Sequence, residues 1–316
     1  MLDKTSTADI GGAGRAQQAP RRGLNLKYAA GIVAVHLVAL LAFVPWFFSW
    51  TGVVLALLGL YVFGTLGINI GYHRLLTHRG LSCPRWLEHA LACLGVCCVQ
   101  DSPLVWVAQH RRHHQYADKA CDPHSPLASF LWAHIGWLMV ASNDSQPSDI
   151  VQRYAPDLQR DQFYAWLAAA DKWALIAFGS WAVFYAAGFA AIVADGGSTA
   201  EANQFGWSLL IWGAAMRTVL VWHITWSVNS VTHLWGYRSF ATPDNSRNNL
   251  WVSIVSNGEG WHNNHHADPQ AAQHGVGWRE PDMAWLTITV LRHLGLVHEV
   301  VLSRRGLTLR RREFGA

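Results

Sequence analysis

Four long apolar stretches constrain what this chain can fold into more than any other feature. Each spans about 20 residues, the length that a helix needs to cross the hydrocarbon core of a bilayer. Only 14% of the 316 residues are charged, against about 25% in soluble proteins. We therefore predict an all-α integral membrane protein with four transmembrane helices, at about residues 28–48, 53–72, 173–194 and 205–231.

The distribution of Lys and Arg predicts the orientation of these spans. Basic residues precede the first span, lie between the second and third, and follow the fourth, whereas the two short connecting turns lack them. Basic segments stay on the cytoplasmic side of a membrane. We therefore expect both termini and the long middle segment in the cytoplasm, with a disordered arm over residues 1–26, a membrane domain over 27–300 and a basic tail over 301–316. No base-reading motif accompanies the basic clusters, so no nucleic-acid partner is expected.

Two segments outside the spans have the pattern of amphipathic helices. In residues 86–98, apolar side chains recur every three or four positions, which is typical of a helix with one apolar face. A second, weaker pattern follows Pro281. Helices of this kind beside a membrane lie in its interface. We expect them to join a cytosolic helical cap.

Histidine is abundant, and more than half of it lies in short clusters. Of 17 His, nine fall at the end of the second span, in the middle segment, at the end of the fourth span and shortly after it. By the predicted topology all nine lie on the cytosolic side. They are His73, His78, His110, His113, His114, His233, His262, His265 and His266.

Helix geometry gives the spacing within these clusters a meaning. Residues three and four apart share one helix face, so the three His of 110–114 can converge on a pair of metal ions, as can those of 262–266. Asn229 and His233 also share a face. Five residues turn a helix by about 500° and leave His73 and His78 about 140° apart. We expect these two to serve different ions, or the helix to end between them.

A single His on an apolar face is more often a structural residue than a ligand, but four clusters on one side of a membrane domain predict a metal site. Nine imidazoles exceed the four ligands of one zinc ion and suit two redox-active ions, for which imidazole is a good ligand when the metal is iron. A haem between His36 and His223 has no other support. The remaining His are expected in structural or supporting roles: His36, His89, His124, His134, His223, His274, His293 and His298.

Six motifs share their order and spacing with a known family. They are His73-Arg-Leu-x-x-His78, His110-Arg-x-His113-His114, Asp122-Pro123-His124, His134-x-Gly136-Trp137-Leu138, Asn229-Ser-x-x-His233 and Gly258-Glu259-Gly260-Trp261-His262-Asn-x-His265-His266. In these motifs, over about residues 65–270, the chain resembles the membrane fatty acyl desaturases of the stearoyl-CoA (Δ9) type. The resemblance implies that the nine clustered His hold two irons, with Asn229 near one of them through water.

The resemblance also implies a kinked tunnel that holds the acyl chain. Four residues match positions that line its bend, although ordinary packing near a membrane is the alternative for such side chains: Gln100, Trp106, Thr225 and Trp226. Ala108 and Gln109 stand where animal acyl-CoA desaturases have a basic–acidic pair, and Asp101 where Asn is usual. This leaves three carriers open: acyl-CoA, an acyl carrier protein thioester or a phospholipid. A basic face for a phosphorylated headgroup is offered by Arg111, Arg112, Arg153, Arg160 and Lys172.

The expected reaction is O2-dependent desaturation of a long acyl chain. The sequence has no haem-binding domain, Fe–S cysteine motif or nucleotide-binding Gly motif, so electrons would come from an external cytochrome b5-like protein or a ferredoxin. A fatty acyl or lipid hydroxylase on the same scaffold is the nearest alternative. A transporter or metal-storage protein, a receptor without metals and a zinc hydrolase are more distant ones, and transporters place polar residues near the bilayer midplane.

Overall fold

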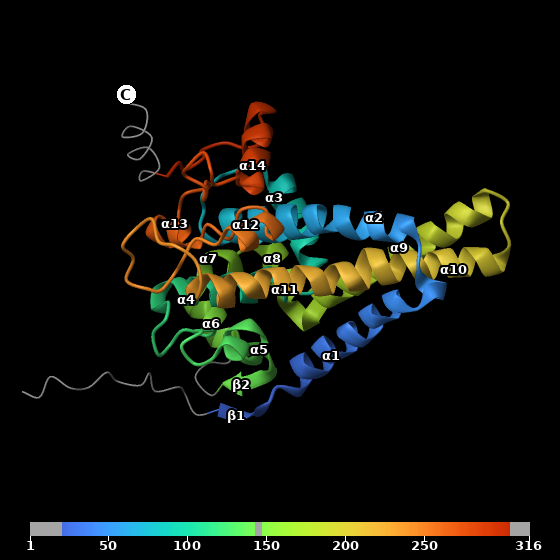
Figure 1. Ribbon diagram of the computed structural model, residues 1–316, viewed down its shortest axis with the longest axis horizontal. Helices are drawn as coiled ribbons and strands as arrows, with labels where there is room; N and C mark the ends of the chain where they lie inside the picture. Colours follow the sequence, from blue (N-terminus) through green and yellow to red (C-terminus); the bar gives the residue numbers. More distant parts are fainter. Residues whose placement is uncertain (1–20, 143–146, 304–316) are drawn as a thin grey trace, which may run out of the picture.

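The computed structural model describes residues 21–142 and 147–303, and these residues are mostly helical (Figure 1). Four helices in the described ranges are long and apolar enough to cross a membrane. They cover Leu26–Phe43, Trp50–Thr77, Gln162–Ala194 and Thr199–His233. The predicted mostly helical fold, with four helices able to cross a membrane, is confirmed.

The first two spans differ in length from the prediction for local reasons. Helix α1 (Leu26–Leu40) continues into the short η1 (Leu41–Phe43) and stops before Pro45, because proline cannot donate a helical hydrogen bond. The second span joins α2 (Trp50–Gly59) to η3 (Leu60–Thr77), a π-helical segment. It runs five residues past the expected end at residue 72 and so includes His73.

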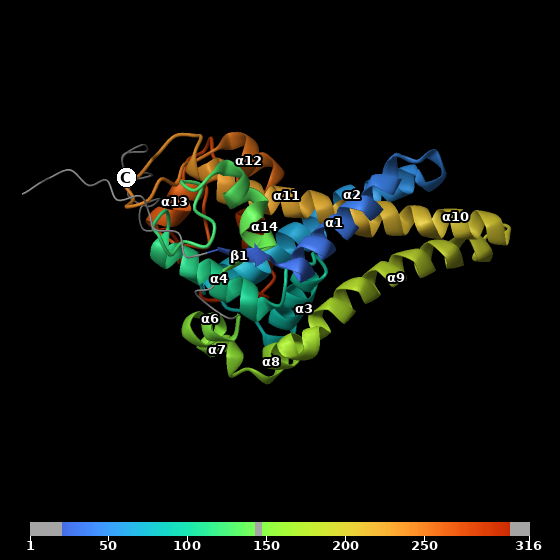
Figure 2. The ribbon, with the colours of Figure 1, turned by 90° about the horizontal axis from the view of Figure 1, so that it is seen from below.

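The third and fourth spans form a hairpin. Helix α9 (Lys172–Ala194) leaves the rest of the bundle at an angle and meets α10 (Thr199–Leu209) at the far end (Figure 2). Ser198 and Glu201 begin α10 with reciprocal side chain–backbone hydrogen bonds, which satisfy two backbone donors that a helix start leaves unpaired. The span continues through η6 (Leu210–Met216), α11 (Arg217–Ser230) and η7 (Val231–His233).

The shorter helices gather at the opposite end of the bundle from the α9–α10 turn (Figure 1). They include α3 and α14, the two helices predicted from the apolar patterns. The full set is α3 (Arg85–Val96), α4 (Pro103–Tyr116), η4 (Trp132–Gly136), α5 (Trp137–Met139), α6 (Pro147–Tyr154), α7 (Pro156–Gln159), α8 (Gln162–Ala168), η5 (Ala169–Asp171), α12 (Leu250–Val255), α13 (His262–Ala267) and α14 (Met283–His293).

Helix α3 packs closely on η3 because glycines meet at the crossing. A Cβ built on Gly67 would lie 2.4 Å from the backbone nitrogen of Gly95, so a larger residue would push the helices apart. Apolar side chains around the crossing, among them Ile68, Leu91 and Val96, belong to the main buried core. This close packing fixes the end of η3, which carries the first histidines.

A small antiparallel sheet joins the start of the chain to its middle. Strand β1 (Arg21–Leu24) pairs with β2 (Val140–Ser142), and the Asn25 backbone N–H donates to the Met139 carbonyl at 2.8 Å. Residues 21–26, which we expected within a disordered arm, are therefore ordered here because β2 supplies their backbone partners. The rest of the predicted arm and residues 304–316 of the predicted tail lie outside the described residues.

Candidate metal centre

The nine clustered His come together in two groups at the end of the bundle where the shorter helices gather. Within each group, one possible ligand atom from every residue lies within 4.8 Å of the others. The five-histidine cluster contains His73, His78, His110, His114 and His265. The four-histidine cluster contains His113, His233, His262 and His266.

Two short helices each contribute to both clusters. Helix α4 directs His110 and His114 to the five-histidine cluster and His113 to the four-histidine cluster. Helix α13 divides its side chains in the same manner, with His265 on one side and His262 and His266 on the other. The three-and-four spacing therefore predicted the convergence on a pair of sites, and each helix bridges that pair.

The expectation that His73 and His78 serve different ions is not what the structure shows, since both lie in the five-histidine cluster. The His78 backbone N–H donates to the His73 carbonyl five residues back, at 3.1 Å. A hydrogen bond to the carbonyl five residues back is that of a π-helix, whose wider turn brings side chains five positions apart close to the same face. The two ring centroids are consequently 4.8 Å apart.

The spacing between imidazole nitrogens fits a shared ion. In the five-histidine cluster, His265 Nε2 lies 3.1 Å from His73 Nε2 and 2.9 Å from His114 Nε2, which lies 3.1 Å from His110 Nε2. In the other cluster, His262 Nε2 and His233 Nε2 are 3.1 Å apart. Nitrogens bound at right angles about 2.1 Å from one ion would lie about 3.0 Å apart. The donor set and its geometry therefore fit two metal ions.

Carboxylates orient three of the imidazoles in the four-histidine cluster. Nδ1 of each lies 2.9–3.0 Å from an aspartate oxygen, in the pairs His113–Asp122, His233–Asp118 and His266–Asp244. A carboxylate at Nδ1 holds the proton there and leaves the Nε2 lone pair for a metal. The buried Nε2 atoms of His113 and His266 have no hydrogen-bond partner among the described residues, as expected of atoms kept for an ion.

In these pairs the carboxylates stay charged, while the imidazole pKa moves in different directions: burial would lower the pKa of His113, but contact with Asp122 outweighs it and raises that pKa. Burial would raise the pKa of Asp122, but contact with His113 outweighs it and holds that pKa well below its usual range. Asp244 behaves likewise through His266. Burial lowers the pKa of His266 to about 4, so its ring is neutral at pH 7. Neutral imidazole is the form that binds metals.

In the five-histidine cluster, carboxylate support comes through an arginine network. His73 Nδ1 lies 2.6 Å from Glu259 Oε2. Arg74 donates to the other oxygen of Glu259 at 2.9 and 3.1 Å, and to both oxygens of Asp282 at 3.0 Å. The guanidinium is fully buried and forms ion pairs with both carboxylates. The network ties η3 to the segments on either side of α13.

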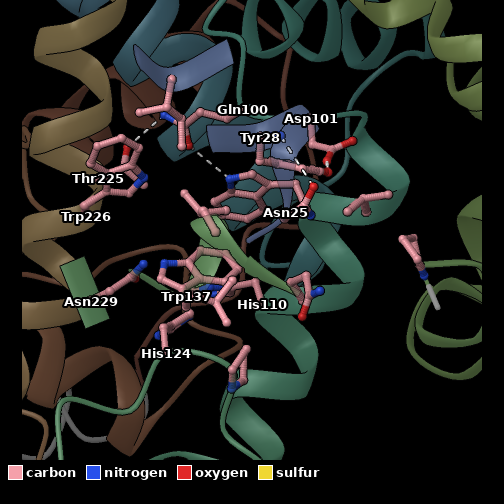
Figure 3. A pocket seen from close by; sticks show the side chains of 18 of the residues that line it. Asn25, Tyr28, Gln100, Asp101, His110, His124, Trp137, Thr225, Trp226 and Asn229 are labelled. Carbon is pink, nitrogen blue, oxygen red and sulfur yellow. Dashed lines mark hydrogen bonds between the residues drawn. The ribbon is translucent and has the colours of Figure 1, made fainter. Parts of the chain in front are cut away.

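A long cavity of about 1420 Å³ leads to this centre, larger than the roughly 300–1,000 Å³ of ordinary small-ligand pockets. Its wall includes His110 of the five-histidine cluster and Asn229 of α11 (Figure 3). The predicted tunnel residues also line it. Gln100 donates to Thr225 Oγ1 at 3.1 Å and accepts from Trp106 Nε1 at 3.2 Å, while Trp226 lies beside Thr225.

Comparison with known proteins agrees with this architecture. The model of the family described as fatty acid desaturase matches residues 48–285. The chain belongs to the fatty acid desaturase family. A relative from Nostoc sp. (strain 36), an sn-2 palmitoyl-lipid 9-desaturase, is 42% identical over 85% of this desaturase and 87% of its own length.

Other relatives of the desaturase differ in the carrier of the acyl chain and in the number given in their names. An sn-1 stearoyl-lipid 9-desaturase from Synechocystis sp. (strain ATCC 27184 / PCC 6803 / Kazusa) is 40% identical over 85% of this chain and 78% of its own. An icosanoyl-CoA 5-desaturase from Limnanthes douglasii is 36% identical over 88% and 72%. Family membership therefore establishes a membrane oxidoreductase of the Δ9-like type and leaves the carrier to other evidence.

Several supporting residues of the desaturase were not predicted from its sequence. Asp118 and Asp244 belong to no motif, and Asp118 is 115 positions from its partner His233. Asp122 and Glu259 do lie within the quoted motifs. An acidic residue close to a histidine was the sequence signal that could have identified them as supporting residues. His274 is buried, with its ring centroid 4.4 Å from that of His265. His274 was expected only in a general structural or supporting role, without a stated partner.

The structure also describes the surroundings of two further features from the sequence, the His36–His223 pair and the basic residue Arg111. His36 Nε2 and His223 Nε2 are hydrogen-bonded to each other at 3.1 Å. Arg111 donates to the carbonyls of Leu76 and Thr77 and to Asp157. It holds the end of η3, and its charge is paired rather than available for a headgroup.

Proposed function

We propose that this desaturase uses two iron ions, one in each histidine cluster, to introduce a double bond into a long-chain acyl group with O2. The observation that carries the proposal is a pair of adjacent imidazole clusters beside one cavity, whose wall includes His110 of one cluster and Asp118 and Asp122, which contact the other. Their nine ligands would be His73, His78, His110, His114 and His265 for one iron and His113, His233, His262 and His266 for the other. Asn229, which points into the cavity from α11, would approach the second iron through water.

The overall reaction converts two adjacent methylenes to an alkene. The acyl chain loses two hydrogens, and O2 with two electrons and two protons is reduced to two waters. When bound, the iron pair supplies the oxygen chemistry that side chains cannot perform. The electrons would arrive from a cytochrome b5-like protein or a ferredoxin, since the sequence contains no carrier motif of its own.

The chain itself would contribute the position of the oxidised bond. Methylenes offer no hydrogen-bonding groups, so one can be selected only by cavity length and shape. Gln100, Thr225 and Trp106 form a hydrogen-bonded set across the wall, and we propose that this set fixes the bend of the bound chain. A fixed bend holds one carbon pair near the metal centre, and such positioning lowers the barrier by avoiding the entropy cost of orientation.

The charge pattern supports an orientation with both termini and the metal centre on the cytoplasmic side. In this multi-pass arrangement the four spans carry the cavity into the membrane. The electron donor would dock at the end where the shorter helices gather. A cytoplasmic metal centre would have direct access to such a donor.

Product analysis tests the proposal. The chain is expressed in a host that lacks unsaturated lipids and supplied with a deuterated saturated acyl chain, and the products are mapped by mass spectrometry. We expect an alkene at one position, and none from His113→Ala. An alcohol would instead show a hydroxylase on this scaffold. Unchanged alkene from His113→Ala would contradict the role of the clusters.

A further inference from the structure

The cavity that reaches the metal centre also reaches the side of the helical bundle, between α1 and α9. Its wall there consists of Gly31, Ile32 and Val35 from α1, and of Ala174 and Phe178 from α9. Gly31 is exposed, and Phe178 is 46% exposed. Residues that line a cavity and are also exposed mark a place where the cavity opens. Both belong to membrane spans, so this opening faces lipid.

The two ends of the opening are closed in different ways. Toward the far end of the bundle, Trp181 of α9 is buried in one apolar cluster with Ile32 and Val35. Toward the metal centre, Lys27 and Asp171 form an ion pair at 2.6 Å, with side chains 67% and 53% exposed. An exposed pair contributes only about 0–1 kcal/mol. The ion-paired end can therefore separate at little cost, whereas the tryptophan end is fixed.

Polar groups continue from this ion pair into the cavity. The Tyr28 hydroxyl donates to the Asp101 carboxylate, whose other oxygen accepts from the Ser102 backbone N–H at 2.7 Å. Figure 3 shows Tyr28 and Asp101 pointing toward each other at the side of the cavity away from Thr225 and Asn229. A lipid places polar ester groups at the membrane interface and its chains in the apolar core. The opening matches this arrangement, because its end near the Lys27–Asp171 ion pair is polar and its interior is apolar.

We propose that the gap bordered by Lys27, Gly31, Asp171 and Phe178 is a lateral portal, through which an acyl chain of an intact glycerolipid enters the cavity from the bilayer. The carrier would then be a membrane lipid, whose headgroup stays at the interface while its chain reaches the metal centre. A water-soluble thioester would have no need of an opening within two membrane spans. This inference rests on the proposed function, because it identifies the substrate class of the same cavity.

Two glycines offer a matched test of the portal. A Cβ on Gly31 or on Gly179 would meet no heavy atom within 4 Å, so Gly31→Phe and Gly179→Phe should both fold. Both positions are exposed on membrane helices. Only Gly31 lines the cavity. A phenyl ring at Gly31 should obstruct the portal, and one at Gly179 should extend into lipid.

Binding is measured by photo-crosslinking, which needs no turnover. Each protein is placed in phosphatidylcholine vesicles containing a phosphatidylcholine with a diazirine in its acyl chain, and labelled peptides are mapped by mass spectrometry. We expect the wild type and Gly179→Phe to be labelled at Trp106 or Thr225 inside the cavity. Gly31→Phe should lose this labelling by about tenfold, as expected when an entry route is obstructed.

Two results would overturn the portal. One is equal cavity labelling in Gly31→Phe and the wild type. The other is cavity labelling by diazirine-stearoyl-CoA added from solution without any labelling by the bilayer lipid. Failure of the proposed function has a different signature: the wild-type cavity is labelled by the lipid, but no alkene forms. That outcome leaves the portal standing and rejects the desaturation chemistry.

Discussion

The two histidine clusters lie side by side and share helices, yet they are supported differently. In the four-histidine cluster, three of the four imidazoles contact an aspartate of their own. In the five-histidine cluster, His73 alone contacts a carboxylate among the described residues, and that carboxylate, Glu259, is held by the buried Arg74. One cluster is oriented ligand by ligand, and the other through a single network that also joins distant segments.

This difference indicates how a pair of similar sites can take unequal roles. An ion with about six positions keeps more of them open when four imidazoles bind it than when five do. The site with fewer ligands has more individual orientation by carboxylates, and one of its ligands, His233, directly follows the helix that carries Asn229. We infer that the four-histidine site, with fewer ligands, leaves more coordination positions open, and that its aspartates hold its geometry.

The largest expected effect is the loss of one imidazole from either cluster. His113→Ala and His110→Ala should each reduce desaturation to about 1% or less, because losing a ligand exceeds the 10–100-fold cost of losing a supporting group. Alkene formation in expressing cells measures this. The exposed His293 provides the control, and His293→Ala should keep full activity. Substantial activity in only one of the two cluster variants would show that one site is dispensable.

Removing a supporting carboxylate should cause a different kind of defect in each cluster. Glu259→Gln leaves the buried Arg74 with one charged partner, and breaking a buried pair costs about 3–5 kcal/mol, so the main result should be a lower unfolding temperature. Asp122→Asn should weaken metal retention by about 10–100-fold with a smaller change in unfolding. Thermal unfolding and metal competition measure the two effects. Asp149→Asn, at an exposed position, should change neither, and identical defects in both variants would remove the distinction.

Acidification should release metal and destabilise the metal-free protein. The pKa of His266 is lowered by burial from an ordinary value of 6.5 to about 4 in the folded state. The unfolded chain therefore binds a proton between these values, and the resulting stability is complete above pH 6.5 and lost as the pH falls toward 4. Unfolding of chelator-treated protein at several pH values measures this. A constant stability across the window would contradict the burial of this ring.

The smallest effect on metal retention is expected at Asn229. An amide is a weak ligand, so Asn229→Ala should change iron retention by less than about tenfold, whereas alkene formation should fall further because the side chain lies in the cavity wall. Iron content and product are measured on the same preparation. Loss of iron as severe as in His113→Ala would make Asn229 a principal ligand and reduce the asymmetry between the sites.

Periodic features were predictable from the sequence, and long-range partners were not. Span length, the apolar face of α3 and the face shared by His110 and His114 follow from local spacing. The joint placement of His73 and His78 does not, because it depends on a π-helical repeat that apolar periodicity does not reveal. Asp118 could not be matched with His233, 115 residues away, because only the folded chain brings them together.

If the two clusters hold a pair of iron ions, as we propose, iron should be found within both of them. Anomalous diffraction at the iron edge, from crystals of protein purified from iron-replete cells, locates such ions. We expect two iron peaks, one within the five-histidine cluster and one within the four-histidine cluster. A single peak, peaks at other positions, or zinc in both clusters would contradict the proposal.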